Sequence, residues 1–370
     1  MVLYRKYRPE TFDDVVGQTE TVQIIRNQII SNRINHAYLF YGLRGSGKTS
    51  IARILARAVN CTNPVNGNPC CQCEACKNNA TSNADIIEID GASNNSVDVI
   101  RDIIDEANYL PLKNKYKVYI IDEVHMLSNS ALSALLKTIE EPPKHCIFIL
   151  ATTDMEKVLD TIKSRCQKFL FRPLSIQDIV SNMKNILQKE NINNISDEAL
   201  KYIAEKADGS VRDSLSLLDQ CVLMTTTTEG TVTKKHLLDM FGDLETEIVD
   251  KLCYCIEKHN VSESLNILKD SYYNGVNMEV LLKRIYEFYY NKFLGNLSRG
   301  ESNIYEKYVT ILGQTLGKIK YDNNKMIIIE IMVIQLCKLE TISFDGSPIV
   351  YYNSVDRKTL NISSVDTINH

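Results

Sequence analysis

A glycine-rich segment from Gly42 to Thr49 has the residue types and spacing that bind the phosphate groups of a nucleotide. Its sequence, GLRGSGKT, fits the pattern G-x-x-x-x-G-K-[ST], in which backbone amides of the loop surround phosphate oxygens. Lys48 would reach the β and γ phosphates, and the hydroxyl of Thr49 would bind Mg²⁺. We predict a nucleoside triphosphate site that contains Gly42, Gly45, Ser46, Gly47, Lys48, Thr49 and Ser50.

The setting of this loop favours a phosphate site over a merely flexible glycine-rich turn. An apolar run from Ala37 to Tyr41 precedes the loop, and a segment with helical periodicity from Thr49 to Val59 follows it. The motif requires a strand before the loop and a helix after it, because the positive N-terminal end of the helix attracts the phosphates.

Two adjacent carboxylates, Asp122 and Glu123, end a second apolar run that begins at Val118. An enzyme with a phosphate loop needs one acid near Mg²⁺ and another that orients the attacking water. We expect Asp122 to bind the metal and Glu123 to orient the water. The alternative is that the two acids only cap a helix.

Four cysteines, Cys61, Cys70, Cys73 and Cys76, follow the spacing C-x8-C-x2-C-x2-C. Four thiolates in so short a segment suit tetrahedral zinc, and an iron–sulfur cluster is the alternative with less support. Cys71 would leave a single residue before Cys73, which is too short for the usual chelate turn, so we expect it not to bind the metal. We predict a structural zinc module.

The composition is that of a globular protein. The 370 residues are 44% hydrophobic and 24% charged, and the net charge of −4 argues against a broadly basic surface that binds nucleic acid unaided. The chain has neither an apolar run long enough to span a bilayer nor a secretory signal, so we predict a cytoplasmic protein without a membrane contact. A reducing compartment disfavours disulfides.

The elements that must position these residues alternate between strands and helices up to Phe171. Short apolar runs separated by segments of helical period are typical of a parallel sheet with helices on its faces. We predict strands at Ala37–Tyr41, Ile86–Asp90, Lys117–Asp122, Cys146–Ala151 and Lys168–Phe171. We predict helices near Thr49–Val59, Val97–Ala107, Ser130–Ile139 and Met155–Ser164.

After Pro173 the strand signals fade and the periodicity becomes helical. Three amphipathic helices are expected at Ile176–Gln188, Asp197–Lys206 and Val211–Leu223. We therefore predict an α/β domain at 1–174 with the zinc module at 61–76, a small helical domain at 175–241, an all-helical domain at 242–345 and a tail at 346–370.

Several longer segments resemble the AAA+ ATPases of clamp loaders. They are Asp122–Leu127 (DEVHML), Leu135–Pro143 (LLKTIEEPP) and Phe148–Thr153 (FILATT). Two further segments, Tyr7–Pro9 and Phe12–Gln18, make the chain most similar to the bacterial DNA polymerase III gamma/tau family, from Tyr7 to about residue 340. The resemblance implies a P-loop AAA+ domain with a five-stranded parallel sheet, a helical lid and an all-α collar domain for oligomerisation.

The resemblance also implies roles for single residues. Arg165, in Ser-Arg-Cys, would act in trans as a finger that reaches the ATP site of a neighbouring subunit. Thr153, or less well Thr152, matches a sensor of the γ-phosphate, and Arg212 matches a second sensor carried by the lid. The family lines its adenine pocket with residues that match Tyr7, Arg8, Pro9 and Val16, and it carries a zinc module where this chain has its cysteines.

The function that follows from the resemblance is that of a clamp-loader ATPase, which uses ATP to load a sliding clamp onto primed DNA. Its cofactors would be ATP, Mg²⁺ and Zn²⁺. Its partners would be delta-type and delta-prime-type subunits, further gamma/tau copies, the clamp and primed DNA, for which Arg101 is a candidate phosphate contact. The alternatives are another AAA+ machine, such as a branch-migration helicase, and a structural loader subunit that does not hydrolyse ATP.

Overall fold

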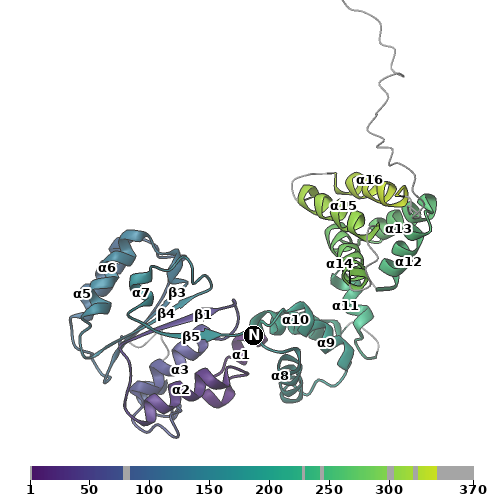
Figure 1. The fold of residues 1–370 in the computed structure, drawn as a ribbon. Coiled ribbons are helices and arrows are strands. Elements are labelled where there is room, and N and C mark those ends of the chain that lie inside the picture. The colour runs from purple at the N-terminus through teal and green to yellow at the C-terminus, as the bar shows by residue number, and fades with distance from the viewer. Residues whose placement is uncertain are drawn as a thin grey trace, which may run out of the picture. The chain divides into compact units, whose positions relative to one another are not determined.

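The computed structural model describes residues 2–77, 84–226, 230–241, 246–297, 304–319 and 324–339. The chain divides into two compact units, Met1–Phe241 and Gly242–His370, which are described separately (Figure 1). The predicted α/β and small helical domains both lie in the first unit, and the predicted tail at 346–370 lies outside the described residues.

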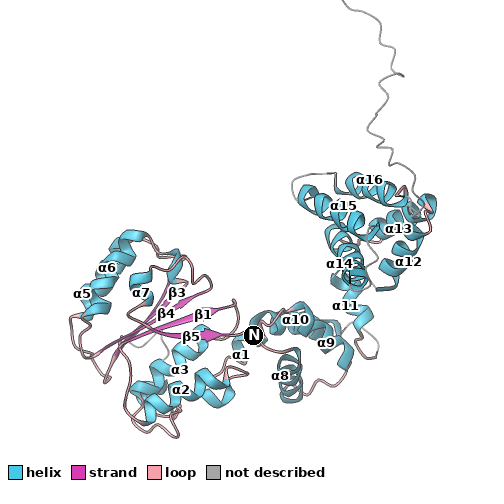
Figure 2. Cartoon of the chain, viewed as in Figure 1, coloured by secondary structure: helices cyan, strands magenta, loops and turns pink. Residues whose placement is uncertain are grey.

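A five-stranded sheet forms the centre of the first unit (Figure 2). Its strands are β1 (Ala37–Gly42), β2 (Ile86–Asp90), β3 (Lys117–Asp122), β4 (Cys146–Thr152) and β5 (Gln167–Phe171). They are paired in parallel in the order β2-β3-β4-β1-β5. The predicted strands are confirmed to within one residue at each end.

Helices cover both faces of this sheet (Figure 1). Side chains alternate along a strand, so Tyr38 and Phe40 of β1 pack towards α2 (Thr19–Ile30) and α3 (Lys48–Asn60). Ala37 and Leu39 belong to the opposite core. The helices of that face are α5 (Val97–Ala107), α6 (Asn129–Glu140) and α7 (Asp160–Lys163).

The helix predicted at Met155–Ser164 is wrong for its first half, since only Asp160–Lys163 is helical. The carboxylate of Asp154 accepts hydrogen bonds from the backbone N–H groups of Glu156 and Lys157, at 3.1 and 3.3 Å. These are contacts of the kind that cap a helix start, but the backbone N–H of Val158 then donates to the oxygen of Met155 at 3.3 Å, which closes a short turn, and α7 begins only at Asp160. The sequence analysis also missed α1 (Leu3–Lys6), η1 (Phe12–Asp14), α2, α4 (Glu74–Lys77) and η2 (Val124–Met126).

Four helices complete the first unit: α8 (Ile176–Lys189), α9 (Asp197–Lys206), α10 (Val211–Met224) and α11 (Lys234–Phe241). Ser175, Ser196 and Ser210 precede the first three and accept a backbone N–H from the first turn, which satisfies donors left free at a helix start. Leu3 at the N-terminus packs into the same apolar cluster.

The described part of the second unit consists of helices joined by short connections, without strands. It contains α12 (Thr246–Glu257), α13 (Val261–Tyr273), α14 (Met278–Leu297), α15 (Ile304–Ile319) and α16 (Lys325–Cys337). Leu281, Ile285 and Tyr289 lie fully buried in its core.

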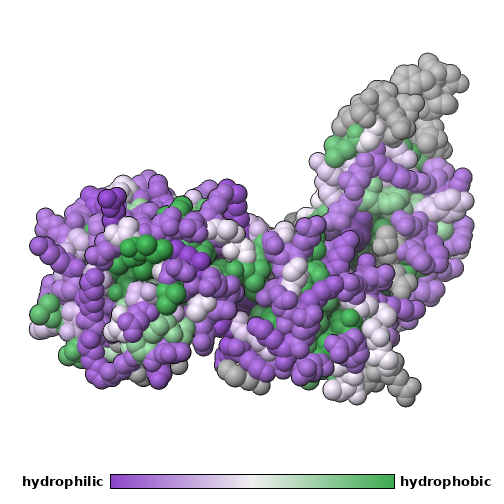
Figure 3. Space-filling model, turned by 90° about the horizontal axis from the view of Figure 1, so that it is seen from below, coloured by the Kyte–Doolittle hydropathy of each residue, from purple (hydrophilic) through white to green (hydrophobic). Residues whose placement is uncertain are grey.

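None of the helices in the described ranges is long and apolar enough to cross a membrane. On the face shown in Figure 3, hydrophilic side chains cover most of the described surface.

Candidate nucleotide site

The strand order brings the predicted catalytic residues to one edge of the sheet. Parallel strands all end at this edge, where β1 leads into the phosphate loop and β3 ends at Asp122. β4 lies between them, and its last residue, Thr152, pairs in register with Tyr41 of β1. Side chains distant in the sequence therefore meet beside the phosphate loop.

Two glycines of the loop are required by close contacts. A Cβ atom on Gly42 would lie 2.1 Å from the backbone oxygen of Phe171, and one on Gly45 would lie 2.0 Å from Ser210 Oγ. Both glycines also have positive φ angles, +143° and +77°, which side chains disfavour. The loop thus depends on glycine both for its own shape and for the approach of α10.

Lys48 is buried at the start of α3, where its ammonium donates to the backbone oxygens of Gly42 (3.0 Å) and Leu43 (2.9 Å). Burial lowers the pKa of Lys48, although the nearby charges of Glu123 and Asp122 partly oppose this. The ammonium is held at the loop by two neutral acceptors that phosphate oxygens would replace.

The two predicted Mg²⁺ ligands touch each other. Thr49 Oγ1 donates to Asp122 Oδ2 at 2.6 Å, and Asp122 Oδ1 accepts the backbone N–H of Glu123 at 3.0 Å. Hydroxyl and carboxylate oxygens are the donors that Mg²⁺ prefers. The residues present at this position therefore fit the predicted metal.

Glu123 is held by the predicted sensor. Its Oε2 accepts the backbone N–H and the hydroxyl of Thr153, at 3.1 and 2.9 Å. Glu123 has φ +48°, a left-handed conformation that is uncommon outside glycine. Thr152, the less favoured sensor, is fully buried and hydrogen-bonds His125. Of the two threonines, Thr153 is the one that contacts the acid.

The start of α10 lies against the phosphate loop. The backbone N–H of Val211 donates to the oxygen of Gly45 at 3.2 Å, and Arg212 follows directly. The Arg212 guanidinium lies 5.1 Å from the centre of the Tyr4 ring, a cation–π distance. The sequence analysis missed Tyr4, and no motif marks it.

The residues predicted to line the adenine pocket lie between the phosphate loop and the helices that follow β5. Arg8 donates through Nε to Ser50 Oγ at 3.3 Å. Tyr7 donates its hydroxyl to Glu190, and both Tyr7 and Val16 pack against the apolar cluster of α8 to α11. Pro9 is half-buried.

Arg165 makes its contacts away from the phosphate loop. Its guanidinium pairs with Glu140 at the end of α6 and donates to the backbone oxygen of Thr161 at 2.8 Å. Its side chain is 36% exposed, and a neighbouring molecule could reach it. Arg101 is exposed and pairs with Asp98 at 3.2 Å.

The four predicted cysteines form one cluster, with all Sγ atoms within 4.8 Å of one another. The Cys70–Cys76 and Cys61–Cys73 Sγ separations are both 4.0 Å. Tetrahedral zinc with Zn–S bonds of about 2.3 Å needs S···S separations of about 3.8 Å. Backbone N–H groups of Cys70 and Cys73 already donate to cluster sulfurs. The donor set fits zinc, and Cys71 lies outside it.

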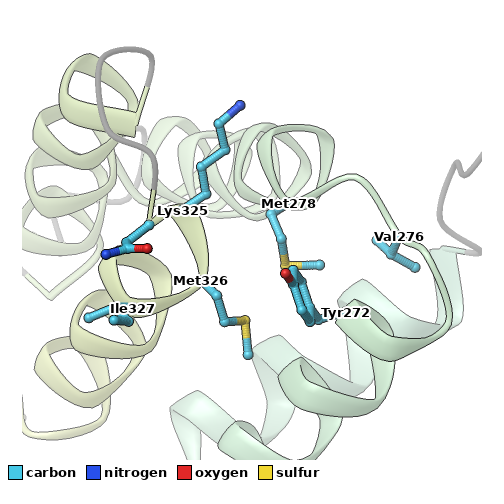
Figure 4. Close-up of a pocket in the computed structure, with 7 residues that line it drawn as sticks. Tyr272, Val276, Met278, Lys325, Met326 and Ile327 are labelled. Atoms are coloured by element: carbon cyan, nitrogen blue, oxygen red, sulfur yellow. The ribbon is translucent and has the colours of Figure 1, made fainter.

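A pocket of about 280 Å³ in the second unit offers no comparable chemistry. Tyr272, Met278 and Met326 give it an apolar wall (Figure 4). Its only lining group with a charge is Lys325, which pairs with Glu279 at 2.5 Å. The edge of the sheet is therefore the candidate active site.

Comparison with known proteins points to one family. A family model described as DNA polymerase III, delta subunit, matches residues 17–175, and one described as DNA polymerase III clamp loader subunit, ATPase lid domain, matches residues 178–227. The Thermotoga maritima RuvB branch migration motor aligns with a TM-score of 0.48 at 18% identity, over 68% of this chain and 80% of that one.

Sequence relatives are much more similar. The DNA polymerase III gamma subunit of Buchnera aphidicola subsp. Baizongia pistaciae is 42% identical over 75% of each chain. The tau subunit of Bacillus subtilis is 39% identical over 91% of this chain but only 63% of its own length. The Escherichia coli tau subunit is 41% identical over 76% of this chain and 43% of its own length.

Proposed function

The chain belongs to the DNA polymerase III gamma/tau family, and on that premise we propose that it is an ATPase subunit of a bacterial clamp loader. The observation that carries the proposal is the contact of Thr49 with Asp122 at 2.6 Å. It joins the phosphate loop to the metal-binding acid, and Glu123 and Thr153 lie at the same edge.

Each residue of the site has a role in phosphoryl transfer to water. The loop amides and Lys48 bind the phosphates, while Thr49 and Asp122 hold Mg²⁺, whose chemistry is to neutralise charge on the phosphate oxygens. Glu123 orients the attacking water, and Thr153 senses the γ-phosphate. Arg212 senses it from the lid, and Tyr7, Arg8, Pro9 and Val16 line the adenine pocket.

Hydrolysis depends on a second subunit in this proposal. The guanidinium of Arg165 contacts Glu140 and the backbone of Thr161 and no residue of the phosphate loop. This position suits a finger that completes the site of a neighbouring subunit. The collar domain at 242–345 assembles the chain with delta-type and delta-prime-type subunits and further gamma/tau copies. ATP binding then opens the sliding clamp, and hydrolysis releases it on primed DNA in the cytoplasm, while zinc stabilises residues 61–76.

The experiment is ATP turnover by the chain alone and with its loader partners, sliding clamp and primed DNA. We expect strong stimulation only by the full set. Arg165→Ala should abolish turnover in the assembly and leave nucleotide binding by the same chain within about twofold, because the finger serves a different site. An equal loss of nucleotide binding in this variant would contradict a finger acting in trans.

A further inference from the structure

His125 lies beside the catalytic edge without a role in the proposed function. It belongs to η2, two residues after Glu123, and its side chain is only 9% exposed. Its Nδ1 atom lies 2.9 Å from Thr152 Oγ1 and 3.4 Å from Glu123 Oε2. One ring nitrogen therefore faces both the end of β4 and the water-orienting acid.

The hydrogen bonds of Thr152 fix which ring nitrogen of His125 carries a proton. A hydroxyl has one hydrogen to donate and two lone pairs. Thr152 Oγ1 donates to the backbone oxygen of Asp154 (2.9 Å) and accepts the backbone N–H of Asp154 (3.0 Å). Its remaining lone pair faces His125, so Nδ1 must be the donor. An imidazole with hydrogen on Nδ1 satisfies all of these groups.

We propose that His125 is a positioning residue for Glu123, with Thr152 fixing the imidazole as its Nδ1–H tautomer. The proposal rests on the proposed ATPase function. The ring nitrogen that binds Thr152 also lies 3.4 Å from Glu123 Oε2. The imidazole therefore borders the carboxylate on this side and restricts its orientation.

Glu123 needs a neighbour that restricts the orientation of its carboxylate when nucleotide binds. Its Oε2 accepts two hydrogen bonds from Thr153. If the Thr153 hydroxyl turns to the γ-phosphate, the carboxylate keeps the backbone N–H of Thr153, and the His125 ring, held by Thr152, lies 3.4 Å from Oε2 on the same side. Since η2 starts from a left-handed Glu123, this N–H and the fixed ring together restrict the orientation of the acid during the reaction.

The first test is spectroscopic and needs no activity. Two-bond ¹H–¹⁵N correlation of the six histidines reports which ring nitrogen of each carries hydrogen, and His125→Asn identifies the signal of His125 by its loss. We expect the Nδ1–H tautomer in the wild type and its loss in Thr152→Val, which removes the hydroxyl but keeps the shape. A wild-type Nε2–H tautomer would overturn the proposal.

The second test compares two replacements of His125 in the full chain assembled with its loader partners. Asparagine can place an N–H where Nδ1–H lies, whereas glutamine places it further out, at the position of Nε2. We expect His125→Asn to keep kcat within about threefold and His125→Gln to lower kcat about tenfold or more with KM for ATP unchanged, because small misplacements of a catalytic group are costly. Melting temperatures establish that both variants fold.

His145→Gln is the matched control. His145 lies at the other end of β4, and its Nε2 faces the backbone oxygen of Ala107 at 3.0 Å, so glutamine can replace it there. We expect unchanged kcat. Equal kcat in wild type, His125→Asn and His125→Gln would overturn the positioning role. If instead Glu123→Gln keeps wild-type turnover, the proposed function has failed, and the tautomer measurement still tests the geometry.

Discussion

Thr153 directs both of its hydrogen-bond donors at one oxygen of Glu123. The backbone N–H lies 3.1 Å and the hydroxyl 2.9 Å from Oε2. The acid proposed to orient water and the residue proposed to sense the γ-phosphate thus share a hydrogen bond. A phosphate that draws the hydroxyl away would change the environment of Glu123 at the same moment, which links sensing to hydrolysis.

Replacing Thr153 by valine removes the hydroxyl and keeps the backbone N–H. A hydrogen bond to a charged group contributes about 1.5–3 kcal/mol, and the partial exposure of this site favours the lower end. We therefore expect kcat for ATP in the assembled loader to fall about tenfold, with nucleotide affinity within about threefold. Thr153→Ser keeps the hydroxyl and should stay near wild type. Valine and serine variants with equal kcat would exclude this coupling.

Gly45→Ala tests the contact between the phosphate loop and α10. The added Cβ would lie 2.0 Å from Ser210 Oγ at a residue with φ +77°, so either the Ser210 side chain that caps α10 or the loop itself must shift. We expect the affinity for ATP, measured by titration calorimetry, to fall at least about tenfold, or ~1.4 kcal/mol.

Gly230→Ala separates backbone strain from this clash. Gly230 also has a positive φ, +93°, but no atom lies within 4 Å of the added Cβ. It should lower stability by about 1 kcal/mol and leave nucleotide affinity unchanged. Equal affinities in the two variants would show that the approach of Ser210 does not matter for binding.

Local signals in the sequence were enough to predict the sheet and much of the site. Buried parallel strands are continuous apolar runs, so Val118–Ile121 and Ile147–Ala151 were visible as strands. The phosphate loop, Asp122 and the four cysteines were visible because each set lies within a short segment. These features could be predicted because the residues that form each of them are close together in the sequence.

The missed features depend on contacts between distant parts of the chain. The order of the strands, which places Thr152 beside β1, is encoded by no local pattern, and the position of Thr152 was expected only through the family resemblance. Tyr4 meets Arg212 only because the N-terminal segment packs on α10. The helix predicted from Met155 is a short turn instead, closed by the hydrogen bond from the N–H of Val158 to the oxygen of Met155, and α7 begins only at Asp160. The finger role of Arg165 stays a prediction, since it concerns a second chain.

The cysteine cluster should hold one zinc ion whose removal destabilises its loop. Cys73→Ser removes a ligand whose Sγ lies 4.0 Å from that of Cys61. Structural zinc sites contribute on the order of 10 kcal/mol to the folding of small modules, so we expect zinc loss by elemental analysis and a lower melting temperature.

Cys71→Ser is the matched control, since Cys71 is adjacent in sequence and lies outside the cluster. This variant should keep one zinc per chain and the wild-type melting temperature. Zinc retained by Cys73→Ser with wild-type stability would contradict the assignment of the ligands.

A buried carboxylate, Asp85, organises the loop that leads into β3. Asp85 is 1% exposed and accepts the backbone N–H groups of Leu112, Lys113 and Asn114, at 2.7, 2.9 and 2.9 Å. Asp85→Asn replaces one acceptor by a donor. Because an unsatisfied buried donor costs about 1–3 kcal/mol, we expect the free energy of unfolding of the first unit to fall by about 2–4 kcal/mol in urea.

Hydrogen exchange tests whether the effect of Asp85→Asn is confined to the loop at residues 112–114. The amides of residues 112–114 should exchange faster in Asp85→Asn, while those of the strands keep their protection, because these three amides donate to the carboxylate that is lost. Asp98→Asn breaks an exposed ion pair with Arg101 and should change stability by no more than about 0.5 kcal/mol. Equal effects of the two replacements would mean that the three hydrogen bonds to Asp85 contribute no more than a surface charge, contrary to their burial.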